Sequence, residues 1–248
     1  MQGLDAWTTP GHSSAVTRRR IDIYDGLRPE DVPAYSLGEA ARLVGLAPST
    51  LRTWTHGRTF PTRRGVSRSQ AIIQLPRPGG FLTFTNVVEA HVLAAMRRKH
   101  SLTLGAIRAA VRYLRDELEL EHPLASKRFK TNGVDLFVDH LEQLINVSQE
   151  GQLGMRSVLD ASLERVEYDQ RGRAVRLFPL FKRSEAPKHV VIDPRRAFGR
   201  PILFGTSVPV ADIRTRFDAG DSVGALAADY NVRRSMIEEA LRAAPQAA

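Results

Sequence analysis

The pattern of apolar and polar positions is most informative in residues 35–57, YSLGEAARLVGLAPSTLRTWTHG. The apolar residues of its first half recur at helical spacing, at Leu37, Ala40, Ala41 and Val44. Ser36 is a good N-cap, and Glu39 three positions later completes a capping box. The pattern therefore predicts a first helix that begins after Ser36.

A second short helix is expected directly after the first. Gly45 supplies a turn, and Pro48 suits the first position of a new helix. Leu51 and Trp54 lie three positions apart, so both face the first helix, and we expect Trp54 to pack there rather than stack on a nucleobase. Two helices joined by a tight turn indicate a helix-turn-helix.

The outward face of the second helix carries short hydrogen-bonding and cationic side chains. They are Ser49, Thr50, Arg52, Thr53 and His56. Such side chains are typical of a recognition helix in a major groove, although a helical hairpin inside a core has the same apolar spacing.

Charge favours the DNA-binding interpretation. Residues 40–115 contain 13 Arg or Lys and one acid, whereas the whole chain has a net charge of +9. Ordinary solvated helices mix the two signs, so this one-signed excess indicates a surface that contacts the phosphates of duplex DNA. The loop after residue 57 adds Arg58, Arg63, Arg64 and Arg68 as further candidates for DNA contact, and the PRPGG turn that follows adds Arg77.

The segments that follow predict a wing and two more helices. Apolar residues 72–75 and 81–84 flank a PRPGG turn, which indicates a hairpin in the place of a wing. Thr85 is placed to cap a helix over residues 86–98, and another helix is expected over residues 104–118.

The helix-turn-helix also contains an Ala, a turn Gly and a Thr-Leu-Arg run followed by an aromatic residue. These are Ala41, Gly45, Thr50, Leu51, Arg52 and Trp54. With the order of elements over residues 35–119, this pattern resembles the MerR-like family of winged-helix transcription regulators. The resemblance implies that the recognition helix and the wing contact DNA. The sequence departs from the family because it has no cysteine for metal sensing, and because His122-Pro123 stops the pattern where a long coiled-coil helix would follow.

Residues 122–187 are expected to form a small α+β region that ends in a linker. Alternation with period two around Asn132-Gly133 indicates a hairpin over residues 127–138. The other elements expected here are helices over residues 140–147 and 155–163 and a second hairpin over residues 165–181.

Residues 188–248 have the pattern of a compact module. Short strands are expected at residues 190–192 and 201–204, followed by three helices, the second of which is capped by Ser222. Phe217 is expected in the core, because it is in helical register with an apolar residue four positions earlier. From spacing alone, the last two helices also suit a second DNA-binding helix-turn-helix.

A set of residues in this module forms a distinctive sequence motif. The set is Asp193-Pro194, Gly199-Arg200-Pro201, Gly205-Thr206, Val208-Pro209-Val210, Ala219-Gly220, residues 227–230, Ile237 and Ala240. They closely resemble a small domain found in VapB-type antitoxins, whose partners are PIN-like ribonuclease toxins. Together with the MerR-like start, the resemblance implies an antitoxin that neutralises such a toxin and represses its own operon.

Residues 188–248 contain 9 bases and 7 acids, a near balance that favours contact with protein over contact with phosphate. The candidates for toxin contact are Arg195, Arg196, Phe198, Arg200, Phe204, Arg233 and Arg234. The DPRRAFGRP loop has arginines suited to an anion, but its Gly and Pro more often shape a turn.

Composition limits other functions. The chain has no cysteine, which excludes disulfides and thiolate metal sites. Its seven histidines lack HxxxH spacing, and no nucleophile elbow or phosphate-cradling motif occurs, so we expect no enzyme, no cofactor and no metal. No segment approaches a membrane span, and a cytoplasmic protein without a membrane partner is expected.

The expected fold is mainly α with small β elements. In order, we expect a flexible arm over residues 1–33, a MerR-like winged helix-turn-helix domain over 34–121, an α+β middle region and linker over 122–187, and a C-terminal hairpin with a three-helix bundle over 188–248. Expected partners are operator DNA and a PIN-like toxin, in a homodimer or a hetero-oligomer with the toxin. The alternative is a ligand-responsive MerR-like regulator without a toxin partner.

Overall fold

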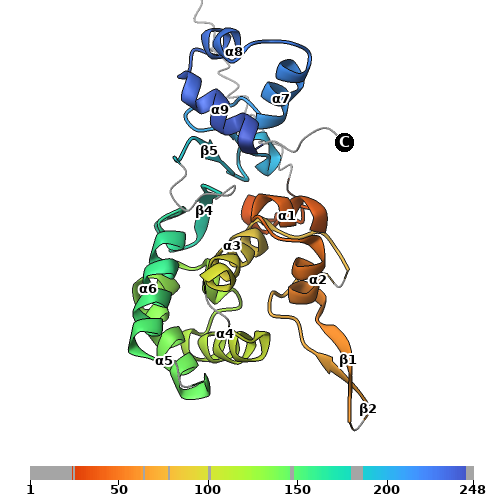
Figure 1. Cartoon of the computed structure of the whole chain (residues 1–248), viewed down its shortest axis with the longest axis vertical. Helices are drawn as coiled ribbons and strands as arrows, with labels where there is room; N and C mark the ends of the chain where they lie inside the picture. Colours follow the sequence, from red (N-terminus) through yellow and green to blue (C-terminus); the bar gives the residue numbers. More distant parts are fainter. Residues whose placement is uncertain are drawn as a thin grey trace, which may run out of the picture.

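The molecule is elongated, with a C-terminal module (residues 188–243) at one end and a β-hairpin projecting at the other (Figure 1). This computed structural model describes residues 24, 26–63, 65–77, 79–99, 102–145, 148–179 and 187–243. Helices predominate, and the strands in this part of the chain form separate two-stranded antiparallel sheets. The predicted fold class is therefore confirmed. Within the described ranges, no helix combines the length and the apolar character that a membrane span requires.

Helix α1 (Leu37–Leu43) begins with the predicted capping box. Ser36 Oγ accepts a hydrogen bond from the Glu39 amide, and the Glu39 carboxylate accepts one from the Ser36 amide at 2.9 Å. The hydrogen bonds from Ser36 lower the pKa of Glu39. Two of the orphan donors at the start of the helix are thus satisfied by its own first turn.

Helix α2 (Pro48–His56) follows after a turn at Gly45, whose φ is 67°. Its first residue is Pro48, as predicted. Leu51 and Trp54 are buried in the cluster that also contains the apolar residues of α1, so the prediction that Trp54 packs inside is confirmed. The helix-turn-helix is therefore present.

The wing is formed by β1 (Arg58–Thr62) and β2 (Gly65–Ser69). The two strands pair in antiparallel register from Arg58↔Ser69 to Thr62↔Gly65. In Figure 1 this hairpin projects from the end of α2, away from the body of the molecule. The segment that the sequence suggested as a loop with arginines is thus the wing itself.

The prediction of a hairpin from residues 72–75 and 81–84 is wrong. Ile72 is 2% exposed and belongs to the main core. Leu82 pairs instead with Tyr35, before α1, in an isolated antiparallel bridge. The apolar residues of this stretch are buried in the core. The wing, whose strands are open to solvent on both faces, is built mostly from polar residues instead.

Helices α3 (Phe84–Lys99) and α4 (Leu104–Leu118) complete the N-terminal unit. The limits of α4 agree with the prediction, but α3 begins earlier and is capped by Thr83 rather than Thr85. Thr83 Oγ1 accepts a hydrogen bond from the Asn86 amide at 3.1 Å, and Asn86 Oδ1 accepts one from the Thr83 amide at 3.2 Å. Thr85 lies inside the first turn, so its side chain cannot cap it.

The predicted hairpin around Asn132-Gly133 is also wrong. A π-helical segment, Phe129–Gly133, runs directly into α5 (Val134–Ile145). A β-carbon at Gly133 would lie 2.8 Å from Phe129 Cδ2, so the glycine permits close packing inside a helix rather than a turn. The π turn adds one residue to the helical spacing, which hid the helix in the sequence pattern.

The rest of the middle region contains α6 (Gln149–Leu163) and a hairpin of β3 (Val166–Tyr168) and β4 (Ala174–Leu177). This second hairpin is as predicted. A single buried cluster extends from Tyr35 to Ile192, and α3 packs on α6 while α4 packs on α5. The winged helix-turn-helix and the middle region therefore share a core, and their division into two domains stays a prediction.

The C-terminal module contains the predicted hairpin and helices. Strands β5 (Val190–Val191) and β6 (Ile202–Leu203) pair antiparallel, with a 3-10 turn, Ala197–Gly199, in the loop between them. Three helices pack around a second buried cluster, and they are α7 (Val210–Asp218), α8 (Val223–Asp229) and α9 (Arg234–Ala243). Ser222 caps α8, as predicted.

Phe217 does not lie in this second core, contrary to the prediction. Its side chain is 38% exposed, whereas Ile213 is fully buried. Four positions along an α-helix rotate a side chain by about 40°, which takes Phe217 to the edge of the buried stripe in the last turn of α7.

Candidate nucleic-acid interface and partner surface

The outward face of α2 carries the residues predicted for a recognition helix. Ser49 and Arg52 are exposed, and Thr50, Thr53 and His56 are half-buried. The Thr53 hydroxyl donates to the Ser49 carbonyl at 3.0 Å, and His56 Nδ1 lies 2.8 Å from the hydroxyl of Thr55. The Thr53 and His56 side chains thus have partners within the helix, and Arg52 is its exposed arginine.

The wing adds cations beside α2. Those exposed on the described part of the hairpin are Arg58, Arg63 and Arg68. The Arg58 guanidinium lies 5.6 Å from the centroid of the Phe60 ring, a cation–π contact that holds it over β1. Arg77 is exposed in the loop after the wing, and Arg64 lies outside the described residues.

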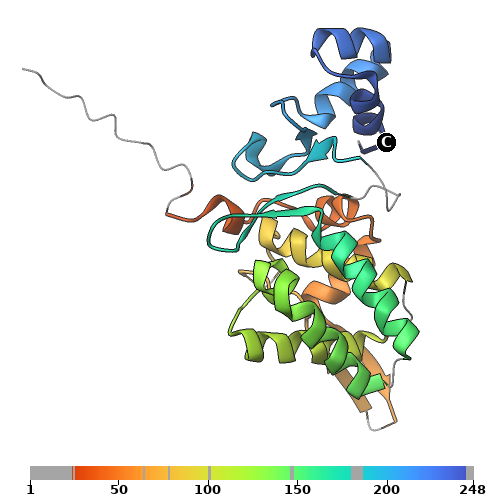
Figure 2. The same cartoon turned by 90° about the vertical axis from the view of Figure 1, so that its left-hand side faces the viewer.

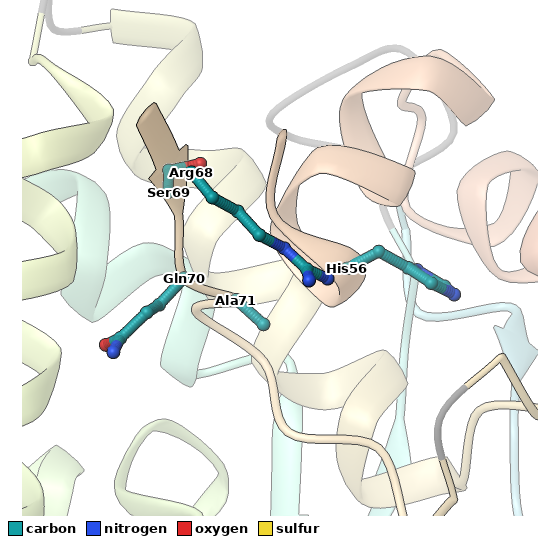
Figure 3. A pocket seen from close by; sticks show the side chains of 5 residues that line it. All are labelled: His56, Arg68, Ser69, Gln70 and Ala71. Atoms are coloured by element: carbon teal, nitrogen blue, oxygen red, sulfur yellow. The ribbon is translucent and has the colours of Figure 1, made fainter. Parts of the chain in front are cut away.

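A shallow hollow of about 490 Å³ lies at the base of the wing. Its lining residues are His56, Arg68, Ser69, Gln70 and Ala71. Figure 3 shows the Arg68 side chain extending toward the end of α2, whereas Gln70 points the opposite way. The hollow thus joins the recognition helix and the wing into one surface, and the positive charge of that surface suits a phosphate backbone.

Gly57 is essential to this surface and was missed in the sequence. It connects α2 to β1 with φ 72°, and a β-carbon there would lie 2.0 Å from the Ser69 carbonyl oxygen. Ser69 Oγ also accepts a hydrogen bond from the Arg58 amide at 3.0 Å, which closes the base of the wing. The available signal was a glycine directly after the last helical residue and before a polar alternating run.

The second candidate surface is the loop of residues 193–200 in the C-terminal module. One side of it contacts the N-terminal unit, since the Tyr35 hydroxyl donates to the Gly199 carbonyl at 2.9 Å. Arg195 Nη2 pairs with Glu30 Oε1 at 2.7 Å. Burial raises the pKa of the Tyr35 hydroxyl, which therefore remains a donor. This side of the loop is an internal contact.

Arg196 and Phe198 belong to the other side of the loop. Phe198 is 73% exposed and has φ 53°, a left-handed conformation that costs a residue with a β-carbon about 1–2 kcal/mol. The exposed Arg196 donates from Nη1 to the Thr206 carbonyl at 3.3 Å. Aromatic side chains and arginine are both enriched at protein–protein interfaces.

Two more predicted contact residues have neighbours within the chain. The Phe204 ring packs edge to face on Phe178, with centroids 5.1 Å apart. Arg200 is exposed near α1, where its charge adds a small part to the low pKa of Glu39, after the larger effect of the Ser36 hydrogen bonds. Both side chains therefore border the contact between the module and the rest of the molecule.

The last two candidates lie on the helical bundle. Arg233 Nη2 is 3.5 Å from His189 Nε2, and Arg234 is exposed at the start of α9. The structure thus places one group of the predicted residues on a single loop, namely Arg195, Arg196, Phe198 and Arg200. Figure 2 shows this module at the end of the molecule opposite the wing.

Two family profiles match the chain. Residues 33–111 match a family described as "Putative DNA-binding HTH domain". Residues 190–243 match a family described as "Protein of unknown function (DUF433)". The first match covers α1 to the first half of α4 with the wing between them, so the predicted helix-turn-helix DNA-binding domain is confirmed.

A relative in Mycobacterium tuberculosis (strain H37Rv), described as "Putative antitoxin VapB45", is 31% identical over 232 residues, which is 86% of this chain and 94% of the relative. The chain belongs to the VapB-type antitoxin family. A second relative, "Uncharacterized protein Rv2308" of the same strain, is 28% identical over 222 residues, which is 85% of this chain and 90% of the relative.

A solved structure is similar to this chain over most of the chain's length. It is the X-ray crystal structure of Rv2018 from Mycobacterium tuberculosis, which is 26% identical, covers 87% of this chain and 100% of its own, and superposes with a TM-score of 0.65. The match covers more of this chain than either family profile does, so the similarity extends beyond the DNA-binding domain.

Proposed function

We propose that this antitoxin neutralises a PIN-like ribonuclease toxin and represses its own operon by binding operator DNA. The observation that carries the proposal is the presence of two separate surfaces, one at the wing end of the molecule and one where the C-terminal module meets the N-terminal unit (Figure 2). The cations of α2 and the wing form one, and the loop with Arg196 and Phe198 forms the other. Membership of the antitoxin family supports the toxin-directed role.

For DNA, the proposed arrangement has α2 in the major groove and the wing on the neighbouring backbone. Arg52 would contact a base edge or a phosphate, and Arg58, Arg63 and Arg68 would contact phosphates. One short recognition helix reads only a few base pairs. The repressor would therefore act as at least a dimer on a pseudo-palindromic operator, with half-sites about one helical turn or a multiple apart.

For the toxin, the proposed contact is the outward side of the loop of residues 193–200. PIN-like active sites, as the family resemblance implies, gather carboxylates around a divalent metal. Arg196 is exposed and would enter such a site, while Phe198 would anchor the complex. Arg195, Arg200, Phe204, Arg233 and Arg234 remain candidates around this centre.

Purification of the full chain from its native host tests the proposal. We expect a small ribonuclease to copurify in near-stoichiometric amount with the wild type. Phe198→Ala and Arg196→Glu should release it while operator binding persists. Phe217→Ala, which truncates another exposed ring of the same module, is the matched control and should retain the toxin.

Two results would contradict the proposed toxin contact. If the ribonuclease copurified undiminished with both loop variants, the contact would lie elsewhere on the chain. Purification without a bound protein, together with a rise in melting temperature when a metabolite is added, would favour the ligand-responsive regulator instead.

A further inference from the structure

Three arginines of α4 hold the segment that returns from the wing to the body of the molecule. Arg108, Arg112 and Arg115 are spaced four and three positions apart, so they share one face of the helix. Arg108 Nε donates to the Gln70 carbonyl at 2.8 Å, and Arg112 Nη2 donates to Gln70 Oε1 at 2.6 Å. Arg115 Nη2 donates to the Ile72 carbonyl at 2.6 Å.

The same segment is bound to α2 from its other side. The amides of Ile72 and Ile73 donate to the Trp54 carbonyl at 2.7 Å and 3.0 Å. Trp54 lies in the last turn of α2. Figure 3 shows the Gln70 side chain pointing away from His56, which lies at the end of the recognition helix. The return segment is thus held between the recognition helix and α4.

The α4 arginines have no carboxylate partner in their hydrogen bonds to the return segment. Burial, followed by the like charge of Arg112, lowers the pKa of Arg108, so the two cations are close together. Their acceptors are neutral carbonyl and amide oxygens rather than carboxylates. Hydrogen bonds from a charged donor are stronger than neutral ones, and here they offset the cost of gathering like charges.

A wing of this kind needs support at its base. In the described part of the chain, β1 and β2 pair only with each other, and an isolated two-stranded hairpin is marginally stable. Its direction relative to α2 therefore depends on the connection at Gly57 and on the contacts of the segment that follows the hairpin. DNA binding is tighter when both contacting elements already have the required orientation.

We propose that Arg108, Arg112 and Arg115 are positioning residues that orient the wing relative to α2 for DNA, and that they are not themselves phosphate contacts. The inference rests on the proposed DNA binding. It divides the basic excess of residues 40–115 into cations that face DNA and cations that hold the DNA-binding surface in shape.

Gln70→Ala tests the inference because it removes the Arg112 acceptor without changing any charge. Operator affinity should fall by about 3- to 10-fold, the effect of one lost hydrogen bond, with the salt dependence of the wild type. Arg112→Ala should cause a similar loss, and the double variant should be no worse than either single one. The matched control is Gln170→Ala, an exposed glutamine in the β3–β4 turn, which should bind like the wild type.

Hydrogen exchange gives a readout that needs no DNA. The amides of Ile72 and Ile73 should exchange faster in Gln70→Ala and Arg112→Ala, while amides of α3 exchange as in the wild type. A general loss of stability would instead accelerate both groups.

The opposite pattern would overturn the inference. A phosphate contact at Arg112 would make the salt slope of Arg112→Ala smaller by about 0.9 and would leave Gln70→Ala with normal affinity and exchange. If the wild type bound no operator, the proposed function would fail, whereas the exchange rates alone decide whether the arginines hold the wing.

Discussion

Gly199→Ala should weaken the contact between the C-terminal module and the N-terminal unit. Gly199 has φ 77°, and a β-carbon there would lie 2.2 Å from the Tyr35 hydroxyl oxygen and 3.1 Å from its ring carbon Cζ. Such a short approach does not occur in proteins, so the tyrosine side chain has to move. It then loses the buried hydrogen bond to the Gly199 carbonyl.

The expected cost has two parts. Placing a β-carbon in a left-handed conformation costs about 1–2 kcal/mol, and losing the buried hydrogen bond costs about 0.5–1.5 kcal/mol. Together they give a loss of about 1.5–3.5 kcal/mol in the free energy of unfolding. Gly205→Ala is the matched control, because Gly205 has φ 82° but has no atom within 4 Å of the new β-carbon. It should lose only the backbone part.

Urea unfolding followed by circular dichroism measures both variants. Repeating Gly199→Ala in a Tyr35→Phe background removes the oxygen that the new β-carbon meets, so its extra cost over Gly205→Ala should shrink. Equal losses for the two glycine variants, or an extra cost that Tyr35→Phe leaves unchanged, would refute the contact described here.

Two further predictions concern pH and the base of the wing. Burial lowers the pKa of His122, but the hydrogen bond of 3.0 Å to Glu89 and the charge of that carboxylate outweigh burial and leave the pKa raised. A raised pKa contributes stability below the ordinary value and loses it as pH rises through the raised value, so His122→Gln should flatten the decline in unfolding free energy as pH rises above the ordinary histidine pKa of about 6.5. An unchanged decline would show that another group titrates. Gly57→Ala should lower operator affinity in a fluorescence anisotropy titration far more than Gly65→Ala, because a β-carbon at Gly57 meets the Ser69 carbonyl and one at Gly65 meets nothing within 4 Å. Similar affinities for the two variants would mean that the geometry at Gly57 does not control the wing.

The helix-turn-helix was predictable because its signals are local. A capping box, a turn glycine and a proline at the first helical position each act within a few residues, and all agree over residues 35–57. The limits of α4 and the bundle of the C-terminal module were predictable for the same reason.

The wing and α5 were mispredicted because an apolar run occurs both in strands and in buried irregular segments, and a glycine occurs both in turns and at close contacts within helices. Ile72 looked like part of a strand but fills the core. Gly133 looked like part of a turn but makes room for Phe129 within a helix. Burial by distant elements decided both, and spacing along the chain does not contain that information.

The contact of the loop with the residues before α1 was beyond sequence reasoning for a different reason. Tyr35 and Gly199 are 164 positions apart, and Glu30 and Arg195 are 165 positions apart. Their pairing depends on how the C-terminal module sits on the N-terminal unit. As a result, Arg195 appeared as a free toxin contact in the sequence although it forms an ion pair inside the chain.

The central claim is that α2 and the wing bind DNA independently of the loop of residues 193–200. A fluorescence anisotropy titration of duplex DNA from the chain's own promoter, at several salt concentrations, tests it with the wild type, Arg52→Ala and Phe198→Ala. We predict at least about 10-fold weaker binding for Arg52→Ala, with a salt slope smaller by about 0.9 if Arg52 touches a phosphate, and wild-type binding for Phe198→Ala. Wild-type binding by Arg52→Ala together with weakened binding by Phe198→Ala would contradict the account.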